Sequence, residues 1–281
     1  MTEAFVSGVD LGAFVRQVLV EDLGEGGDVT SAATIPADAR FDAVMASRDA
    51  VTVAGLPMAT LFFQALDPEV FVEQLVADGT RVSAGTALMR LSGNARALLS
   101  AERSALNSVQ HLTGIATMTR AYVDAIAGTG CILLDTRKTL PGLRVLEKYA
   151  TRMGGAENHR MRLDDGLLIK DNHIAVAGGV ATAVRAAKAA GLALPVQVEV
   201  DRIDQIEPAL AAGADRLLLD NMGPDTLLEA VALVAGRVPT EASGGVRLDT
   251  IRAIAESGVT YVSVGRITQS APAADIGLDY G

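Results

Sequence analysis

Six short apolar segments alternate with amphipathic, alanine-rich segments from residue 131 onward, and this alternation constrains the fold more than any other feature. The apolar segments cover residues 131–136, 167–171, 196–200, 216–220, 238–243 and 261–265. Over the last four, the centres are about 20–23 residues apart, the length of one strand–helix unit. Strands this apolar are typical of a parallel sheet covered on both faces. Since no GxGxxG turn follows the first strand, we expect a barrel smaller than the usual eight strands rather than a dinucleotide-binding fold.

The N-terminal third has a different pattern. Residues 41–91 contain short alternating runs separated by Gly and Asp, which predict half-exposed antiparallel strands, with helices over residues 11–23 and 57–66. A longer helix is predicted over residues 100–126, with Ser100 as its N-cap and an apolar stripe that includes Leu112 and Ile115. We therefore expect an α+β sandwich domain over residues 1–108 and the barrel domain over 109–268. The tail, residues 269–281, is expected to pack on the first domain.

Composition and charge exclude several classes of protein. The chain carries 24 Lys and Arg against 34 Asp and Glu, a net charge of −10, which argues against a nucleic-acid-binding protein. Cys131 is the single cysteine, so neither an intramolecular disulfide nor a cysteine-based zinc cluster is possible. The first ten residues lack the features of a signal peptide, and no apolar run approaches the roughly 18 residues of a membrane span. We expect a soluble, cytoplasmic protein with no membrane partner.

All six predicted strands end in charged or glycine-rich residues. In a parallel barrel the carboxyl ends of the strands meet at one face, where barrel enzymes place their active sites. We therefore expect a functional site at this face. The strand-end residues are Asp135, Thr136, Arg137, Lys138, Lys170, Asp171, Asn172, His173, Glu199, Asp201, Asp220, Asn221, Glu241, Ser243, Gly244, Gly245, Val264, Gly265 and Arg266.

The last two strand ends predict a phosphate site. Ser243, Gly244 and Gly245 precede an expected helix over residues 248–258, and Gly265 follows the final strand. Barrels commonly bind phosphate between their last two loops, using backbone N–H groups and a helix N-terminus. Glycine allows the backbone to approach the phosphate oxygens closely.

Two carboxylates and a group of cations indicate the rest of the ligand. Glu199 and Asp220, on neighbouring strands, could share Mg²⁺ or bind sugar hydroxyls, and both alternatives stay open. Residues 137–170 contain eight Lys and Arg against four Asp and Glu, a local charge of +4. We therefore expect a strongly anionic ligand with more than one phosphate or carboxylate group.

Specific motifs in the chain are similar to those of the quinolinate phosphoribosyltransferase family (nicotinate-nucleotide pyrophosphorylase, carboxylating). The resemblance extends from about Glu21 to the C-terminus. Its motifs are Glu102-Arg103, DTRKTLPGLR (135–144), KYATRMGGAENHR (148–160), LIKDNH (168–173), VEVD (198–201), LLLDNM (217–222), EASGG (241–245) and the closing VGRITQS…DIGLD.

The resemblance implies a fold, a reaction and an assembly. The fold is an N-terminal α/β sandwich followed by an incomplete α/β barrel. The reaction transfers phosphoribosyl from phosphoribosyl pyrophosphate to quinolinate with decarboxylation, giving nicotinate mononucleotide, CO₂ and pyrophosphate, with Mg²⁺ as cofactor. The assembly is a homodimer, with a higher oligomer also open, in which one subunit's N-terminal region completes the partner's site.

The resemblance also implies roles for individual residues. Arg103 would reach across the dimer to a quinolinate carboxylate, while Arg137, His159 and Arg160 would hold the rest of the dicarboxylate and flank its ring. Lys138 and Lys170 would meet the phosphate-rich end and the reacting centre, and Glu199 and Asp220 would bind ribose hydroxyls and Mg²⁺. We expect Lys138, Lys170, Glu199 and Asp220 to be the catalytic residues. The expected substrate-binding set adds Arg103, Thr136, Arg137, His159, Arg160, Ser243, Gly244, Gly245, Val264, Gly265 and Arg266.

The chain departs from the family pattern at Leu140, Arg162, Arg266 and Gln269. These positions put the details of specificity in doubt rather than the activity. His111 and His173 are expected to be structural. Two other functions are weighed: a phosphoribosyltransferase that acts on nicotinate or another aromatic acid, and a non-catalytic barrel that senses phosphorylated metabolites. An enzyme for a single carboxylate would need fewer cations than the four present, Arg103, Arg137, His159 and Arg160. A sensor could dispense with Glu199, Asp220 or Lys170, and all three are present.

Overall fold

The structure, a computed structural model, describes residues 6–280, which form two compact units. Unit 1 contains the chain up to Thr119, the segment Val145–Gly155 and the residues from Ser270 onward. Unit 2 contains Arg120–Arg144 and Ala156–Gln269. The boundary expected at residue 108 lies inside a helix, and the segment 145–155 of the expected barrel domain belongs to unit 1.

Unit 1 is built on a four-stranded antiparallel sheet in the order β12-β1-β5-β3. Its strands are β1 (Arg40–Ser47), β3 (Phe71–Gln74), β5 (Ala87–Asn94) and β12 (Ile276–Tyr280). The C-terminal β12 pairs with β1, with Ala43 opposite Tyr280. A second, small antiparallel pair consists of β2 (Val51–Thr52) and β4 (Arg81–Val82). The predicted antiparallel α+β layer is confirmed.

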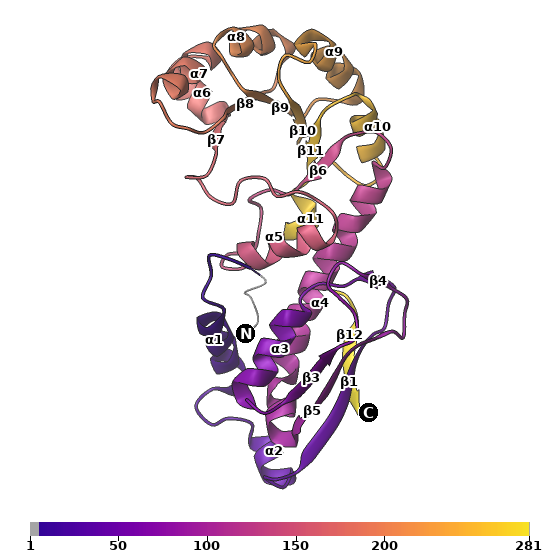
Figure 1. Cartoon of the computed structure of the whole chain (residues 1–281). Helices are drawn as coiled ribbons and strands as arrows, with labels where there is room; N and C mark the ends of the chain where they lie inside the picture. The colour runs from indigo at the N-terminus through magenta and orange to yellow at the C-terminus, as the bar shows by residue number, and fades with distance from the viewer. Residues whose placement is uncertain (1–5, 281) are drawn as a thin grey trace. The chain divides into compact units, whose positions relative to one another are not determined.

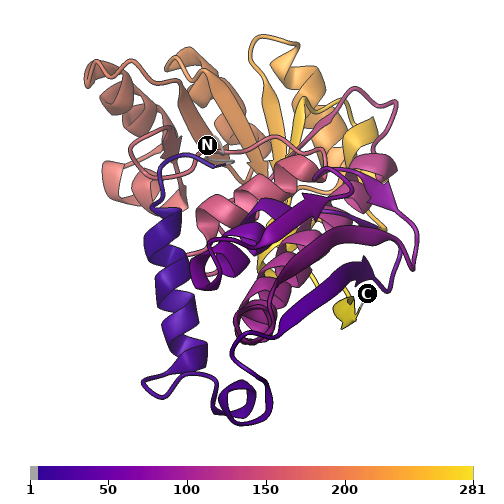
Figure 2. The same ribbon diagram turned by 60° about the horizontal axis from the view of Figure 1, so that its bottom comes forward.

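Helices cover one face of this sheet, as Figure 2 shows for α3 and the first part of α4. The helices with residues in unit 1 are α1 (Leu11–Leu23), α2 (Val29–Thr34), α3 (Leu56–Leu66), α4 (Ala95–Ala125) and α5 (Arg144–Met153). The carboxylate of Asp78 accepts hydrogen bonds from the backbone N–H groups of Gly55 and Leu56 at the start of α3. The loop before β4 therefore stabilises a helix end that no local side chain caps.

The long helix α4 begins five residues earlier than predicted. Asn94 Oδ1 accepts a hydrogen bond from the backbone N–H of Ala97 at 3.1 Å, which is an N-cap interaction. The prediction of Ser100 as the N-cap is wrong: its hydroxyl donates to Asp28 Oδ2 at 3.1 Å. The predicted apolar stripe is buried, with Leu112 2% and Ile115 0% exposed.

Unit 2 contains a six-stranded parallel sheet in the order β6-β11-β10-β9-β8-β7. The strands are β6 (Ile132–Leu134), β7 (Leu167–Ile169), β8 (Val196–Val200), β9 (Arg216–Asp220), β10 (Thr240–Ser243) and β11 (Tyr261–Ser263). The sheet curves round but stays open between β6 and β7 (Figure 1). A single parallel bridge joins Leu134 of β6 to Glu157, which adds a short strand-like segment at this edge. The predicted incomplete parallel barrel is confirmed.

Helices lie on the outer side of the curved sheet (Figure 1). They are α6 (Asp171–Ala177), α7 (Val180–Ala189), the 3-10 helix η1 (Ile203–Gln205), α8 (Ile206–Ala211), α9 (Pro224–Val234) and α10 (Ile251–Glu256). The short α11 (Arg266–Gln269) follows the end of β11. Two local predictions are wrong. The second strand ends at Ile169, because Asp171 begins α6, and the helix expected from residue 248 begins at Ile251. No helix of the described chain has the length and apolarity required to cross a membrane.

Candidate active site

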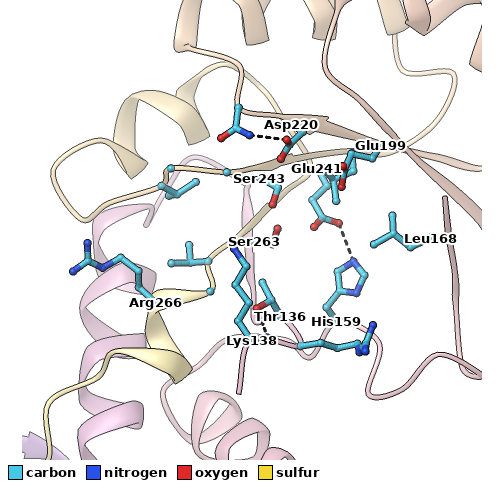
Figure 3. A pocket seen from close by; sticks show the side chains of 18 of the residues that line it. Thr136, Lys138, His159, Leu168, Glu199, Asp220, Glu241, Ser243, Ser263 and Arg266 are labelled. Carbon is cyan, nitrogen blue, oxygen red and sulfur yellow. Dashed lines mark hydrogen bonds and ion pairs between the residues drawn. The ribbon is translucent and has the colours of Figure 1, made fainter. Parts of the chain in front are cut away.

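A cavity of about 820 Å³ lies within unit 2, at the carboxyl ends of its strands. Its lining contains every predicted site residue except Arg103. Arg103 lies exposed on α4 in unit 1. In Figure 3, Ser243 and Arg266 lie on one side of the cavity, His159 and Leu168 on the other, and Lys138 between them.

The loop before β7 brings His159 and Arg160 to the cavity. Asp135, at the end of β6, accepts hydrogen bonds from Asn158 Nδ2 at 2.5 Å and from the backbone N–H of His159 at 2.9 Å. Arg160 Nη1 donates to the carbonyl of Gly166 at 2.9 Å, which closes the loop on itself. Asp135, itself 0% exposed, therefore couples the loop conformation to the barrel.

Two guanidinium groups repel each other at this end of the cavity. Burial and the positive charge of Arg137 lower the pKa of Arg160 below its ordinary value. Among the described residues, no hydrogen-bond partner meets the buried Nε of Arg137. An anionic ligand with two carboxylates would relieve the repulsion and supply the missing acceptor.

Two carboxylates occupy neighbouring strand ends, Glu199 on β8 and Asp220 on β9. Lys170 Nζ, at the end of β7, lies 2.9 Å from Glu199 Oε2. Burial and the negative charge of Glu199 raise the pKa of Asp220. This pair therefore favours a cation or a hydroxyl donor nearby.

The glycine-rich end of the cavity is closely packed. A Cβ atom on Gly244 would lie 2.2 Å from Asn221 Oδ1, and its φ of +90° is one that side-chain-bearing residues rarely adopt. Asn221 itself has a φ of 55°, and its backbone N–H donates to Ser243 at 2.8 Å. A Cβ atom on Gly265 would lie 2.6 Å from Lys138 Cδ. Glycine is therefore required at position 244, whereas a side chain at position 265 would displace the flexible end of Lys138.

The expected helix N-terminus does not directly follow the Gly244-Gly245 turn, since α10 begins six residues after Gly245. The four-residue α11 follows Gly265 immediately. Backbone N–H groups of the two loops, rather than a helix end, are therefore the donors that we expect to meet an anion here.

Several lining residues were not among the predicted site residues: Leu168, Leu218, Asn221, Glu241, Val246, Arg247, Ser263 and Gln269. Glu241 and Asn221 lie in motifs that the sequence already singled out, so their position at strand ends was a usable signal. Leu168 and Leu218 carry no such signal, because they resemble any other buried strand residue. The two histidines expected to be structural make local contacts: His111 Nε2 lies 2.8 Å from Glu147 Oε1, and His173 Nδ1 accepts from the backbone N–H of Lys170.

The chain matches one protein family over nearly its whole length. Residues 28–113 match the N-terminal domain, and residues 115–279 the C-terminal domain, of quinolinate phosphoribosyl transferase. It is 45% identical to the nicotinate-nucleotide pyrophosphorylase [carboxylating] of Mycobacterium leprae, over 94% of this chain and 95% of the relative. It is 43% identical to the chloroplastic enzyme of that name from Oryza sativa, over 96% of this chain and 77% of the relative.

Solved structures show the same fold. The nicotinate-nucleotide pyrophosphorylase of Francisella tularensis superposes with a TM-score of 0.92 at 37% identity, covering 98% of this chain and 99% of that one. Human nicotinic acid phosphoribosyltransferase, at 14% identity and a TM-score of 0.63, shares the fold alone, with 96% of this chain and 74% of that chain covered. Together with the family match over both domains, these relatives show that the chain belongs to the quinolinate phosphoribosyltransferase family.

Proposed function

We propose that the cavity of unit 2 transfers the phosphoribosyl group of phosphoribosyl pyrophosphate to quinolinate, with loss of CO₂. The products are nicotinate mononucleotide and pyrophosphate, which makes this a step of de novo NAD biosynthesis. One observation carries the proposal: a single cavity combines paired guanidinium groups, two strand-end carboxylates and two glycine loops. The relatives are named nicotinate-nucleotide pyrophosphorylase [carboxylating], which describes the same reaction in the reverse direction.

The dicarboxylate binds among the cations. Arg137 and Arg160 hold the quinolinate carboxylates, and their mutual repulsion in the empty cavity favours an anion between them. His159 flanks the pyridine ring. Leu140 and Arg162, where the chain departs from the family pattern, lie outside the lining of the cavity, so neither departure counts against quinolinate.

The ribose lies beside the two carboxylates. Departure of pyrophosphate leaves positive charge on the ribose ring, and Glu199 and Asp220 stabilise that charge. The quinolinate nitrogen attacks C1 of the ribose as the C1–O bond to pyrophosphate breaks. The 2-carboxylate then leaves as CO₂, the electron pair left on C2 is stabilised by the adjacent pyridinium nitrogen, and C2 takes up a proton from water. No protein nucleophile is required.

Mg²⁺ fits the same pair of carboxylates as a cofactor. Within residues 6–280, no group of three or more His, Cys, Asp and Glu side chains is arranged to hold a metal ion. Mg²⁺ often binds through one or two carboxylates together with substrate phosphates, and burial and the negative charge of Glu199 raise the pKa of Asp220, so that a cation beside the pair would favour its ionised form. When bound, the ion would neutralise negative charge on the diphosphate, while Lys138 and Lys170 would act on the same groups.

The phosphates bind at the other end of the cavity. Ser243, Gly244 and Gly245 on one loop, and Val264, Gly265 and Arg266 on the next, cradle the phosphate groups, and the hydroxyl of Thr136 supports the backbone of Lys138 at 3.0 Å. Arg266, a departure from the family pattern, adds positive charge here and is consistent with an anionic ligand.

Arg103 contributes from a second copy of the chain. We assign it to a quinolinate carboxylate in the partner's cavity of a homodimer, because it is the one predicted site residue outside the cavity lining. The net charge of −10 and the absence of a membrane-crossing helix from the described residues are compatible with a cytoplasmic enzyme that binds neither nucleic acid nor membranes.

The test is a substrate assay with purified protein, phosphoribosyl pyrophosphate and Mg²⁺. With quinolinate we expect release of CO₂, pyrophosphate and nicotinate mononucleotide in equal amounts. Nicotinate, which has one carboxylate, should react far more slowly, because the two guanidinium groups would be left incompletely neutralised. Product from nicotinate but not from quinolinate would replace this function with the alternative, a nicotinate phosphoribosyltransferase.

A further inference from the structure

A buried carboxylate, Glu241, lies in the wall of the cavity and has no part in the mechanism above. It is the second residue of β10, its exposed fraction is 0%, and it lines the cavity. A carboxylate buried this completely requires strong partners to remain in the folded protein.

The partners of Glu241 come from both sides of the barrel interior. Gln197 Nε2, on β8, donates to Glu241 Oε2 at 2.8 Å. His159 Nε2 lies 3.4 Å from the same oxygen, a contact drawn in Figure 3. Burial raises the pKa of Glu241, but hydrogen bonds with His159, Ser263 and Gln197 outweigh burial, and the pKa is lowered. Glu241 is therefore ionised at neutral pH.

The other edge of the imidazole is also held. His159 Nδ1 accepts a hydrogen bond from the backbone N–H of Arg160 at 2.8 Å. A ring nitrogen that accepts carries no proton, so the proton of a neutral imidazole is on Nε2, directed at Glu241. Both edges of the ring thus have defined partners, and the ring is 12% exposed.

Arg216 provides a positive charge beside Glu241. Arg216 Nη2, on β9, lies 3.6 Å from Glu241 Oε2, and its guanidinium carbon lies 3.7 Å from the centre of the Tyr261 ring. Because His159 is neutral in this arrangement, Arg216 supplies the positive charge that a buried carboxylate needs. Arg216 does not line the cavity, so its charge acts on Glu241 and not on a ligand.

We propose that Glu241 is a positioning residue that holds the imidazole of His159 as a neutral Nε2–H donor, oriented to flank the ring of quinolinate. This inference rests on the proposed function, which places quinolinate beside His159. It follows that the positive charge around the dicarboxylate comes from arginine and lysine, and that His159 contributes the surface of its ring. The separation of 3.4 Å is long for a hydrogen bond, and such contacts often shorten when substrate binds.

Three variants test the proposal. Glu241→Gln keeps an oxygen that can accept from His159 Nε2–H. The double variant Glu241→Met/Arg216→Met removes the acceptor and its buried counter-charge together, so that no unpaired buried charge is left to unfold the protein. Arg216→Lys is the matched control, since it keeps a positive charge beside Glu241 and leaves the contact between Glu241 and His159 in place. For each variant, KM for both substrates, kcat, Tm and the NMR signal of the His159 Nε2–H proton in ¹⁵N-histidine-labelled protein are measured.

We expect the double variant to raise KM for quinolinate about tenfold and to leave KM for phosphoribosyl pyrophosphate within about twofold. The protected Nε2–H signal should be lost by exchange with water. Glu241→Gln should keep the signal and most of the quinolinate affinity, and Arg216→Lys should keep both. A double variant whose Nε2–H signal is unchanged would overturn the proposal, as would equal losses for the two substrates.

The two proposals can fail separately. The double variant could lose the Nε2–H signal while KM for quinolinate is unchanged. Glu241 then positions His159, but His159 does not contribute to quinolinate binding, and its assignment under the proposed function is wrong. If the wild-type protein does not use quinolinate at all, the NMR signal still decides whether Glu241 holds the imidazole.

Discussion

At the scale of single residues, the cavity depends on positions where one atom more would displace a functional group. Gly265 is the clearest case, because a Cβ atom there would overlap Lys138 Cδ. The flexible lysine can move, so the cost falls on its placement and not on the fold. Gly244 differs, since both its positive φ and its distance from Asn221 exclude a side chain.

Gly265→Ala should therefore reduce activity without reducing stability. We expect kcat to fall about 100-fold, because displacement of a charged group by about 1 Å can cost that much, while Tm stays within about 1 °C of wild type. Gly223→Ala is the control: its φ is −73°, and no atom would lie within 4 Å of the added Cβ. Equal activity of the two variants would mean that the position of Lys138 is unimportant.

Asp220 shows the opposite relation between stability and activity. Its pKa is raised above the ordinary value of 3.8, so the ionised form is disfavoured in the folded state and costs folding free energy at neutral pH. Asp220→Asn should raise Tm at pH 7 by about 1–3 °C and lower kcat about 100-fold. The difference in Tm should disappear as the pH falls below 3.8, where the carboxyl is protonated in both states.

The comparison requires thermal unfolding curves of both proteins from pH 7 to pH 3. Asp201→Asn, at a neighbouring carboxylate whose side chain is 60% exposed, is the matched control and should leave Tm unchanged. A lower Tm for Asp220→Asn at pH 7 would show that the ionised carboxylate stabilises the fold, contrary to the direction of its pKa.

At the scale of elements, the start of α4 shows how local signals compete. Both Asn94 and Ser100 are good N-cap residues, and an apolar stripe is visible only from Leu106 onward. The helix begins at the earlier one, because Asn94 ends β5 and the chain turns directly from strand to helix. The sheet, which the local sequence does not encode, decides between two equally suitable caps.

Asn94→Ala should therefore destabilise unit 1 more than Ser100→Ala does. We expect the free energy of unfolding to fall by about 1 kcal/mol for loss of the cap, and by less for Ser100, whose hydroxyl makes a single hydrogen bond to Asp28. Urea unfolding at pH 7 measures both values. Asn94→Asp keeps the acceptor for Ala97 but loses the hydrogen bond from Asn94 Nδ2 to the carbonyl of Ala37, so it should restore only part of the loss. A larger effect at Ser100 would place the N-cap where the sequence alone suggested it.

At the scale of the whole molecule, the site is assembled from distant parts of the chain, and net charge describes it poorly. The chain has a charge of −10, but residues 137–170 carry +4 and supply most of the cations of the cavity. Arg266, and Arg103 in unit 1, are the remaining cations assigned to the ligand. The net charge of the whole chain therefore affects solubility, whereas the local excess of positive charge determines that the ligand is anionic.

A homodimer whose sites use Arg103 from the partner predicts complementation between two inactive variants. Arg103→Ala and Lys138→Ala, dissociated together and reassembled in equal amounts, should form mixed dimers in half of the cases. Each mixed dimer has one site with both substitutions and one with neither, so about a quarter of wild-type activity should return. Assay at low quinolinate concentration, with each variant reassembled alone as control, measures the recovery. No recovery above those controls would place Arg103 in its own chain's site or outside any site.

The sequence by itself determined the barrel and the edge that carries the site. Six apolar runs at the spacing of strand–helix units leave few other folds, and the ends of parallel strands necessarily meet, so Glu199, Asp220 and Gly265 could be placed together from local pattern. Only the tertiary structure brought Gln197, Arg216 and His159 around Glu241, and paired β12 with β1. These contacts join residues far apart in the chain, and a side chain's partners across a barrel depend on the curvature of the sheet, which no local pattern encodes.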